Sequence, residues 1–251
     1  MADLLALSSR IIDEAVTDEA VNRVTNELSE LADDLALVES FSHCAALATD
    51  EGLVCFDVSG ARTGAAVVGA LRGWSDAPVH SIVYTHGHVD HVGGVTSVVK
   101  AQDHAVPVHI HDEDLHMLLD PVGSSGMLGR HLAGLDVSPP EVIEGLDDGT
   151  VVSGAGMRFT ALHTPGHTRG SVCLRLDAAD TPPILFSGDH LFAGSIGRTD
   201  LPGGSFDELM ASMEEKILPL DDDLLVLPGH GPHTTIGQER RTNPFLAQLQ
   251  R

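Results

Sequence analysis

Hydrophobic and polar positions along this chain follow two different periods, and the change of period divides the sequence. Between residues 4 and 35, apolar residues recur mostly every three or four positions, the spacing of an amphipathic helix. The apolar positions of this stretch are Leu7, Ile11, Ile12, Ala15, Val16, Val21, Val24, Leu28 and Leu31. We therefore expect residues 1–35 to form an N-terminal helical extension, interrupted near Thr17, where a new helix could be capped.

From residue 36 onward the pattern changes to short apolar runs bounded by turn residues, which is typical of strands. Asp50-Glu51-Gly52 separates two such runs and predicts a tight hairpin. The predicted strands cover residues 35–38, 44–48, 53–58, 79–85, 106–110, 151–152, 157–162, 171–176 and 184–187. Helices predicted over 64–73 and 92–103 alternate with them, so we expect an α/β (α+β) fold and a single domain over residues 36–251.

The stretch from residue 112 to residue 140 has a less regular pattern than its neighbours. It contains an apolar group around Met117, then a glycine-rich segment and the pair Pro139-Pro140. A segment of this kind forms either a lid or pocket wall, or an ordinary surface helix and loop. The sequence leaves both readings open.

Charge narrows the range of partners. The net charge is -23, and the chain has only two lysines, Lys100 and Lys216. Nucleic-acid binding needs a basic surface that displaces counterions, so we expect no nucleic-acid partner. The acidity is better explained by solubility, and the acidic face of the predicted N-terminal helix by contact with solvent. The alternative use of that helix is to form a homodimer.

Cysteine usage and hydropathy point to a cytoplasmic protein. Cys44, Cys55 and Cys173 form no C-x-x-C pair, and each lies in an apolar run, so we expect buried, reduced thiols. The first residues lack the basic start of a secretory leader, and no apolar run is long enough to span a membrane. We therefore expect no membrane association.

Histidines and aspartates gather in a turn at residues 86–91, His-Gly-His-Val-Asp-His. An apolar strand precedes this turn, and residues typical of a helix start follow it. Residues two apart in an extended turn point the same way, so His86 and His88 can converge on one ion. Asp90 and His91 lie where the chain bends into the helix, which suits a second ion. A core filled in this way would be unusual, because every buried polar ring needs a partner.

Further candidate ligands follow the strands of the second half. His167 lies in Thr-Pro-Gly-His-Thr, Asp189 follows Ser-Gly, and His230 lies in Pro-Gly-His-Gly. Asp57 also ends a strand, where a carboxylate could support the metal loop from behind, although a plain turn residue is equally consistent with the sequence. Imidazole and carboxylate donors suit zinc, iron or manganese.

Taken in order, these motifs resemble the metallo-β-lactamase fold superfamily from about residue 40 to residue 245. The run Gly194–Ser205 and the segments Thr235–Glu239 and Asn243–Phe245 resemble its glyoxalase II-like branch, the hydroxyacylglutathione hydrolases and their short relatives. The resemblance implies a four-layer αββα sandwich. The chain ends 21 residues after His230, without the helical region that holds glutathione in full-length members. The resemblance therefore supports thioester hydrolysis as the reaction more strongly than it supports glutathione as the thiol of the substrate.

The resemblance also assigns roles to the candidate residues. It implies two divalent metal ions, zinc or alternatively iron or manganese, held by His86, His88, Asp90, His91, His167, Asp189 and His230. Asp189 would bridge the ions, and Asp90 would orient a bridging hydroxide and pass on its proton. Outside the ligand set, Asp57 would support the metal loop from behind, and Arg198 would shape the loop near the site. The substrate would be a small molecule, a thioester.

Other functions of the same superfamily remain as alternatives. A mononuclear iron persulfide dioxygenase uses part of the same ligand set, and other members hydrolyse lactones or other esters. A binding protein without catalysis would require a broken site, and every expected ligand is present.

Overall fold

The computed structural model describes residues 24–126, 129, 132, 134–154, 157–177 and 183–249. These residues form two compact units, an N-terminal unit up to Leu146 and a C-terminal unit from Asp147. The predicted helical extension lies mostly at residues 1–23, outside the described part of the chain. The prediction of one domain over residues 36–251 stays a prediction.

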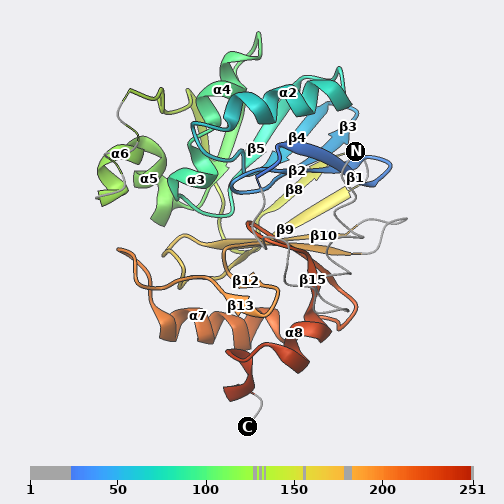
Figure 1. Cartoon of the computed structure of the whole chain (residues 1–251), viewed down its shortest axis with the longest axis vertical. Coiled ribbons are helices and arrows are strands. Elements are labelled where there is room, and N and C mark those ends of the chain that lie inside the picture. The colour runs from blue at the N-terminus through green and yellow to red at the C-terminus, as the bar shows by residue number, and fades with distance from the viewer. Residues whose placement is uncertain are drawn as a thin grey trace. The chain divides into compact units, whose positions relative to one another are not determined.

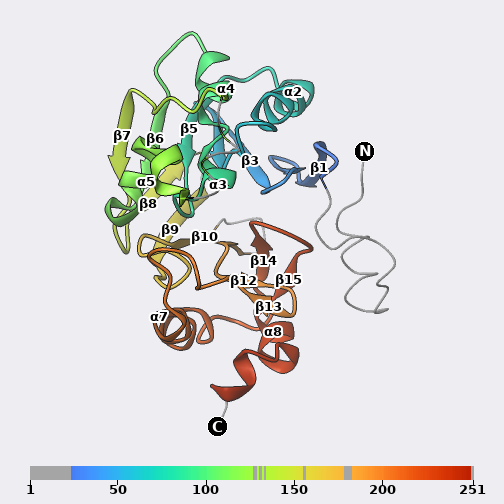
Figure 2. The ribbon, with the colours of Figure 1, turned by 60° about the vertical axis from the view of Figure 1, so that its left-hand side comes forward.

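Within its described residues, the N-terminal unit contains a seven-stranded sheet in the order β1-β2-β3-β4-β5-β6-β7, of which Figure 1 labels β1 to β5 and Figure 2 labels β6 and β7. The strands are β1 (Glu27–Ala32), β2 (Leu35–Glu39), β3 (Cys44–Thr49), β4 (Gly52–Phe56), β5 (Val79–Val83), β6 (Pro107–Ile110) and β7 (Val142–Gly145). The pairs β1-β2, β2-β3 and β3-β4 are antiparallel, and the pairs β4-β5, β5-β6 and β6-β7 are parallel. Parallel neighbours bring their carboxyl ends to one edge of the sheet, where polar residues from different strands can meet.

Helices cover this sheet and close its core. They are α2 (Gly64–Trp74), α3 (Val89–Val92) and α4 (Val95–Lys100). Val67 of α2 and Val98 of α4 are fully buried in one cluster with strand residues such as Ile82 and Val108. A fully buried aliphatic side chain contributes about 1.5 to 3 kcal/mol, so this cluster holds α2 and α4 against the strands that position the histidine turn.

Most of the predicted strands are confirmed, including the hairpin, whose register pairs Thr49 with Gly52. Three predictions need correction. Residues 27–32, expected to be helical, form strand β1, which pairs with the edge of β2. The three-residue spacing of Leu28 and Leu31 fits a helix, but pairing with a buried neighbouring strand outweighs that local preference.

The other two corrections concern the histidine turn and the region after it. The helix predicted over 92–103 begins at Val89 and is divided into α3 and α4. The irregular region contains η1 (Asp112–Asp114), α5 (Leu115–Leu119) and α6 (Pro121–Ser124), followed by the unpredicted strand β7. β7 is an edge strand with little buried surface, so its sequence lacks a strong alternating pattern.

Within its described residues, the C-terminal unit contains a six-stranded sheet in the order β15-β14-β11-β10-β9-β8. The strands are β8 (Val151–Gly154), β9 (Met157–His163), β10 (Val172–Asp177), β11 (Ile184–Gly188), β14 (Leu225–Pro228) and β15 (Thr234–Thr235). β11 and β14 are parallel, and the other neighbours are antiparallel. A short separate ribbon pairs β12 (Leu191–Phe192) with β13 (Ser195–Ile196).

Helices pack on one side of the C-terminal sheet (Figure 2). They are α7 (Phe206–Ser212), η3 (Met213–Ile217), α8 (Ile236–Thr242) and η4 (Leu246–Gln248). Leu209, Met213 and Ile236 bury their side chains against Leu185 and Val226 of the sheet. Each unit is therefore a sheet with helices on it, and the predicted α/β class is confirmed.

Among the described helices, none is long and apolar enough to cross a lipid bilayer.

Candidate metal centre

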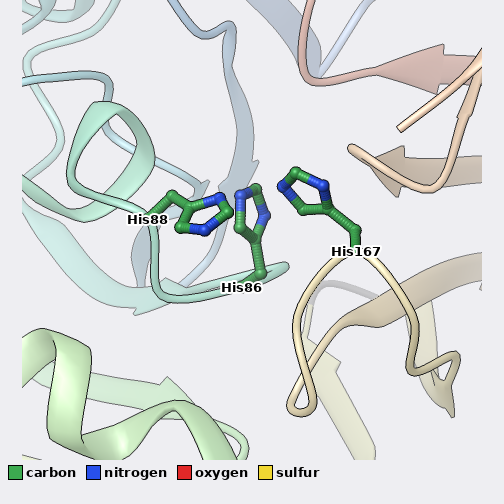
Figure 3. A group of neighbouring side chains, drawn as sticks. All are labelled: His86, His88 and His167. Carbon is green, nitrogen blue, oxygen red and sulfur yellow. The ribbon is translucent and has the colours of Figure 1, made fainter. Parts of the chain in front are cut away.

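The histidine turn of the N-terminal unit lies directly after β5. His86 and His91 are buried, and their ring centroids lie 4.0 Å apart. His88, the residue that caps α3, has its ring centroid 4.9 Å from that of His86 in an edge-to-face arrangement (Figure 3). The backbone nitrogens of His91 and Val92 donate to the His88 carbonyl, so the first helical turn fixes where these rings stand. The turn thus gathers three imidazoles in a small space.

Asp57 supports this turn from the neighbouring strand. It follows β4, which runs parallel to β5, and its backbone nitrogen donates to the Val83 carbonyl, so the two strand ends lie together. Its φ of 53° lies in the left-handed region, which is uncommon for a residue with a side chain and recurs at functional sites. Its side chain is buried and accepts from the backbone nitrogen of Thr85 at 2.9 Å.

The hydrogen bonds of Asp57 determine which nitrogen of each histidine carries the proton. His91 Nδ1 lies 2.8 Å from Asp57 Oδ2, and the hydroxyl of Thr85 donates to the same oxygen at 2.8 Å. Because a carboxylate only accepts, His91 Nδ1 must donate. The single proton of the Thr85 hydroxyl is already committed, so Thr85 Oγ1 accepts from His86 Nδ1 at 3.1 Å. In the neutral form of both rings Nε2 then carries no proton, so it is the nitrogen that can bind a cation.

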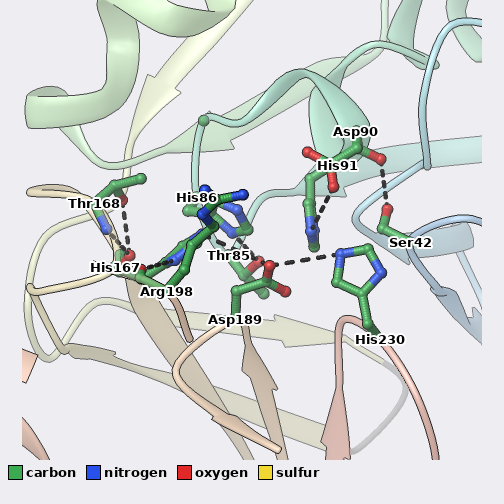
Figure 4. A network of polar contacts seen from close by, with 12 residues as sticks. Ser42, Thr85, His86, Asp90, His91, His167, Thr168, Asp189, Arg198 and His230 are labelled. Atoms are coloured by element: carbon green, nitrogen blue, oxygen red, sulfur yellow. Dashed lines mark hydrogen bonds and ion pairs between the residues drawn. The ribbon is translucent and has the colours of Figure 1, made fainter. Parts of the chain in front are cut away.

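Asp90 lies in the first turn of α3 and is partly exposed. Its Oδ2 stands 3.9 Å from His91 Nε2. Its backbone carbonyl accepts from the hydroxyl of Ser42 at 2.6 Å, a contact that joins α3 to the loop after β2 (Figure 4). Asp90 is therefore held through its main chain, while its carboxylate can face a ligand and solvent.

The C-terminal unit brings together the other three candidates. Asp189 follows β11 and His230 follows the parallel strand β14, whose end is tied to it because Gly229 N donates to the Gly188 carbonyl at 2.8 Å. Asp189 Oδ2 lies 3.5 Å from His230 Nε2 and 3.6 Å from His167 Nε2 (Figure 4). These distances exceed those of charge-assisted hydrogen bonds. One carboxylate oxygen thus stands between two imidazole nitrogens, as expected for groups that share cations.

His167 has a fixed proton as well. It lies in the loop between β9 and β10, and its Nδ1 is 2.8 Å from the backbone carbonyl of Arg198. A carbonyl accepts only, so Nδ1 donates and Nε2 is left with its lone pair. The ring is 2% exposed, which leaves little water to compete for that nitrogen.

Arg198 thus contacts His167 through its main chain and not through its guanidinium. That side chain is exposed and forms two hydrogen bonds with Asp200, at 2.8 and 2.9 Å. The hydrogen bond with Asp200 raises the pKa of Arg198, and the hydrogen bond from Arg198 lowers the pKa of Asp200 to about 2.

The remaining histidines of the described chain have other surroundings. His190, next to Asp189, is buried. Its burial, and to a smaller extent the charge of nearby His167, lowers its pKa to about 3, so it is neutral near pH 7. His163 Nε2 contacts the Arg169 carbonyl at 2.8 Å. His104 contacts the Val79 carbonyl and Asp103, His109 lies 3.5 Å from Glu144, and His116 is exposed. His131 lies outside the described residues.

The donors present fit divalent metal ions. Each unit offers imidazoles together with a carboxylate, and the buried rings His86, His91 and His167 each hold Nδ1 in a hydrogen bond, so that Nε2 can act as the ligand. This chemistry suits zinc, iron and manganese alike, so the donor set does not select among them. Among the described cysteines none lies in either group.

Sequence reasoning missed several residues that organise these groups. Thr85 stands next to His86 in the chain, and that adjacency was the available signal. Ser42 lies far from Asp90 in the sequence, and Phe192, whose ring centroid is 6.3 Å from that of His230, belongs to a two-residue strand. Such contacts depend on tertiary structure and leave no local pattern.

Comparison with known proteins is consistent with this geometry. A family model described as metallo-beta-lactamase superfamily matches residues 38–230. A Haemophilus influenzae protein named hydroxyacylglutathione hydrolase GloC is 36% identical over 171 residues, which are 68% of this chain and 77% of that protein.

Two solved structures have similar folds. The BLEG-1 B3 metallo-beta-lactamase is 35% identical, with a TM-score of 0.70, over 88% of this chain and 99% of its own. TTHA1623, solved in a di-iron-bound form, is 36% identical, with a TM-score of 0.64, over 82% and 95%.

Proposed function

Because this chain belongs to the metallo-β-lactamase superfamily and is one of its metallo-hydrolases, we propose that it hydrolyses thioesters with two divalent metal ions. The GloC relative, whose name gives a hydroxyacylglutathione thioester as its substrate, supports this reaction class. The sequence segments that resemble the glyoxalase II-like branch support it further.

The observation that carries the proposal is the fixed protonation of the candidate ligands. In the N-terminal unit, Asp57 and Thr85 select the tautomer of the neutral His91 and His86 rings that carries its proton on Nδ1 and leaves Nε2 unprotonated. In the C-terminal unit the Arg198 carbonyl does the same for His167. This arrangement suits metal ligands, because a ligand requires a neutral ring in one defined tautomer.

We assign the ligands as the resemblance implies. His86, His88 and His167 would hold one ion, Asp90, His91 and His230 the other, and Asp189 would bridge them. The support is that Asp189 directs a single oxygen toward both His167 and His230. When bound, the ions would lower the pKa of a water molecule to about 7 and polarise the substrate carbonyl.

The residues of the chain then have distinct tasks. Asp90 is partly exposed beside His91, so its carboxylate can accept a proton from the attacking water and release it to solvent. Asp57 keeps His91 and, through Thr85, His86 in place while the charge at the site changes. A thiolate leaving group is stable near neutral pH, so this chemistry needs no strong general acid.

The test is hydrolysis of S-lactoylglutathione by protein loaded with zinc, iron or manganese, followed by loss of thioester absorbance. We expect a metal-dependent rate, with zinc the first ion to try and His88→Ala as the background control. A coenzyme A thioester run in parallel separates thioester chemistry from recognition of glutathione. Hydrolysis of neither thioester by any metal form would overturn the proposal and direct the search to lactones, then to oxygen uptake with persulfides.

A further inference from the structure

The β12–β13 ribbon and the residues just after it touch all three candidate ligands of the C-terminal unit. The Arg198 carbonyl accepts from His167, and the ring of Phe192 lies against His230. Gly197 passes so close to Asp189 that an added Cβ would stand 1.7 Å from the Asp189 carbonyl oxygen. A shift of this short ribbon would therefore displace the surroundings of three ligands at once.

Two strands of two residues each cannot hold such a ribbon in place alone. Its turn is fastened from outside by helix α8. Glu239 Oε2 accepts from the backbone nitrogen of Gly194 at 2.8 Å. Asn243, one helical turn later, donates from Nδ2 to the Ser195 carbonyl at 2.9 Å. Consecutive residues of the ribbon turn are thus bound by a side chain of α8 and by that of Asn243, the residue that caps its C-terminus.

These hydrogen bonds between α8 and the ribbon turn centre on the buried carboxylate of Glu239. Glu239 is 2% exposed, and Glu is almost never buried unless its oxygens are satisfied. Besides Gly194, its oxygens accept from the Thr234 hydroxyl at 2.6 Å and from Asn243 Nδ2 at 2.8 Å. Three donors converge on one carboxylate, so the position of the Gly194 backbone is tightly defined.

We propose that Glu239 and Asn243 are positioning residues of the metal centre, which act on His167 and Asp189 through the β12–β13 ribbon. The inference rests on the proposed function for the presence of metal ions, although the mechanical link lies wholly within the C-terminal unit. Both residues lie in segments that resemble the glyoxalase II-like branch, and neither segment contains a candidate ligand. The proposal therefore gives these segments a role at the site.

Variants at Glu239 separate hydrogen bonding from charge. Glu239→Ala removes the carboxylate that accepts from Gly194, Thr234 and Asn243, while Asn243 keeps its bond to the Ser195 carbonyl. Glu239→Gln keeps an amide oxygen for Gly194 and Asn243, and its amide nitrogen can donate to the Thr234 hydroxyl. Asn243→Ala removes the bond to Ser195, the donor to Glu239 and the acceptor for the backbone nitrogen of Phe245, and it leaves the Glu239 carboxylate in place, so it remains informative if Glu239→Ala folds poorly.

Arg240→Gln is the matched control on the same helix. Arg240 binds Asp222 and the carbonyls of Leu218 and Leu220, which lie outside the ribbon. Its substitution weakens the anchoring of α8 without removing a ribbon contact, so it reports what loss of helix stability alone does. Thermal melting of every variant shows that the binding measurements are made on folded protein.

The first readout is affinity for Zn²⁺ and Co²⁺, measured by competition with a chelator. We expect Glu239→Ala to bind about 10- to 100-fold more weakly, the usual effect of removing a supporting partner of a ligand. Asn243→Ala should show a smaller loss, while Glu239→Gln and Arg240→Gln stay close to wild type. If Glu239→Ala and Arg240→Gln lose the same affinity, the positioning role is overturned.

The second readout needs no metal. In metal-free protein with ¹⁵N-labelled histidine, the Nδ1 proton of His167 should exchange faster with water in Glu239→Ala, because the Arg198 carbonyl has moved. The Nδ1 proton of His91, bound to Asp57 in the other unit, is the internal control and should not change. Unchanged His167 exchange would refute the positioning role. Failure of the wild type to bind metal, with faster His167 exchange in Glu239→Ala, would instead count against the proposed function alone.

Discussion

The two groups of candidate ligands are supported by different means. In the N-terminal unit one buried carboxylate, Asp57, orients two imidazoles by side-chain hydrogen bonds, directly for His91 and through Thr85 for His86. In the C-terminal unit a backbone carbonyl, that of Arg198, orients His167, and the carboxylate Asp189 is itself a candidate ligand. The same histidine tautomer is therefore favoured by the Asp57 side chain in one unit and by the position of the Arg198 carbonyl in the other.

This difference determines how each group can be damaged. A single substitution removes a side-chain support, so the N-terminal group depends on the identity of Asp57. A carbonyl is present whatever residue carries it, so the C-terminal group depends on where the ribbon runs. Each of the following predictions tests this contrast, beginning with the ligands themselves.

Removal of a ligand should have the largest effect, since neither kind of support replaces a donor atom. We expect His88→Ala to lose bound metal and to lower thioester hydrolysis by on the order of 10³-fold. His116→Ala is the matched control, because His116 is exposed and lies outside both ligand groups. Metal content by elemental analysis and kcat/KM are the measurements. Equal losses in both variants would mean that the division into ligands and other histidines is wrong.

Asp57→Asn should have the next largest effect. The amide nitrogen replaces one oxygen, so a donor would face the Thr85 backbone nitrogen, or the Thr85 hydroxyl and His91. We expect metal affinity to fall about 10- to 100-fold, as for other supporting carboxylates. Chelator competition measures this loss.

Thr85→Val extends this test to His86. The substitution keeps the shape of the side chain and removes the hydroxyl that links His86 to Asp57. It should cost less affinity than Asp57→Asn, because His91 keeps its bond. A greater loss in Thr85→Val than in Asp57→Asn would show that Asp57 does not organise the N-terminal group.

In the C-terminal unit, Gly197→Ala should be more damaging than Gly194→Ala. An added Cβ at Gly197 would lie 1.7 Å from the Asp189 carbonyl oxygen and 3.2 Å from His167 Nδ1, so the ribbon must move. At Gly194 the space is open, and the cost is that of a φ of +71°, about 1 kcal/mol. We expect both to lower the melting temperature but only Gly197→Ala to weaken metal binding, by about tenfold. A comparable loss of metal affinity in both would remove the distinction between strain and displacement.

The sequence predicts the candidate ligands of both groups, but it predicts the side-chain support of the N-terminal group far better than the carbonyl support of the C-terminal one. Asp57 is recognisable as a carboxylate that ends a strand, and His86 and His88 as rings two residues apart in a turn. Arg198 is also singled out, but the reason lies in its carbonyl, and a carbonyl has no residue signature. Glu239 and Asn243 act on Gly194 and Ser195 across 45 and 48 positions of the chain, so no local pattern reveals them.

The fold shows the same division between local and tertiary information. Strands with a strong apolar pattern, such as β9 and the fully buried β11, are predicted to within a residue or two. The edge strands β1 and β7 are missed, because each depends on the neighbour that it pairs with more than on its own hydrophobic pattern. Tertiary pairing supplies the information that these segments lack.

The smallest effect is expected from Asp200→Asn, which removes the side-chain partner of Arg198 and leaves the Arg198 carbonyl in place. The pKa of Asp200 is lowered from 3.8 to about 2, first by the hydrogen bond from Arg198. A carboxylate whose folded pKa lies below its unfolded value stabilises the protein above the unfolded pKa, and this contribution is lost as the pH falls through the folded pKa. The wild type should therefore melt slightly above Asp200→Asn at neutral pH, and the difference should fade between about pH 3.8 and about pH 2. Because both side chains are exposed, the shift should be small, and metal affinity should not change. A loss of metal affinity as large as that of Asp57→Asn would show that the guanidinium, and not the carbonyl, supports His167.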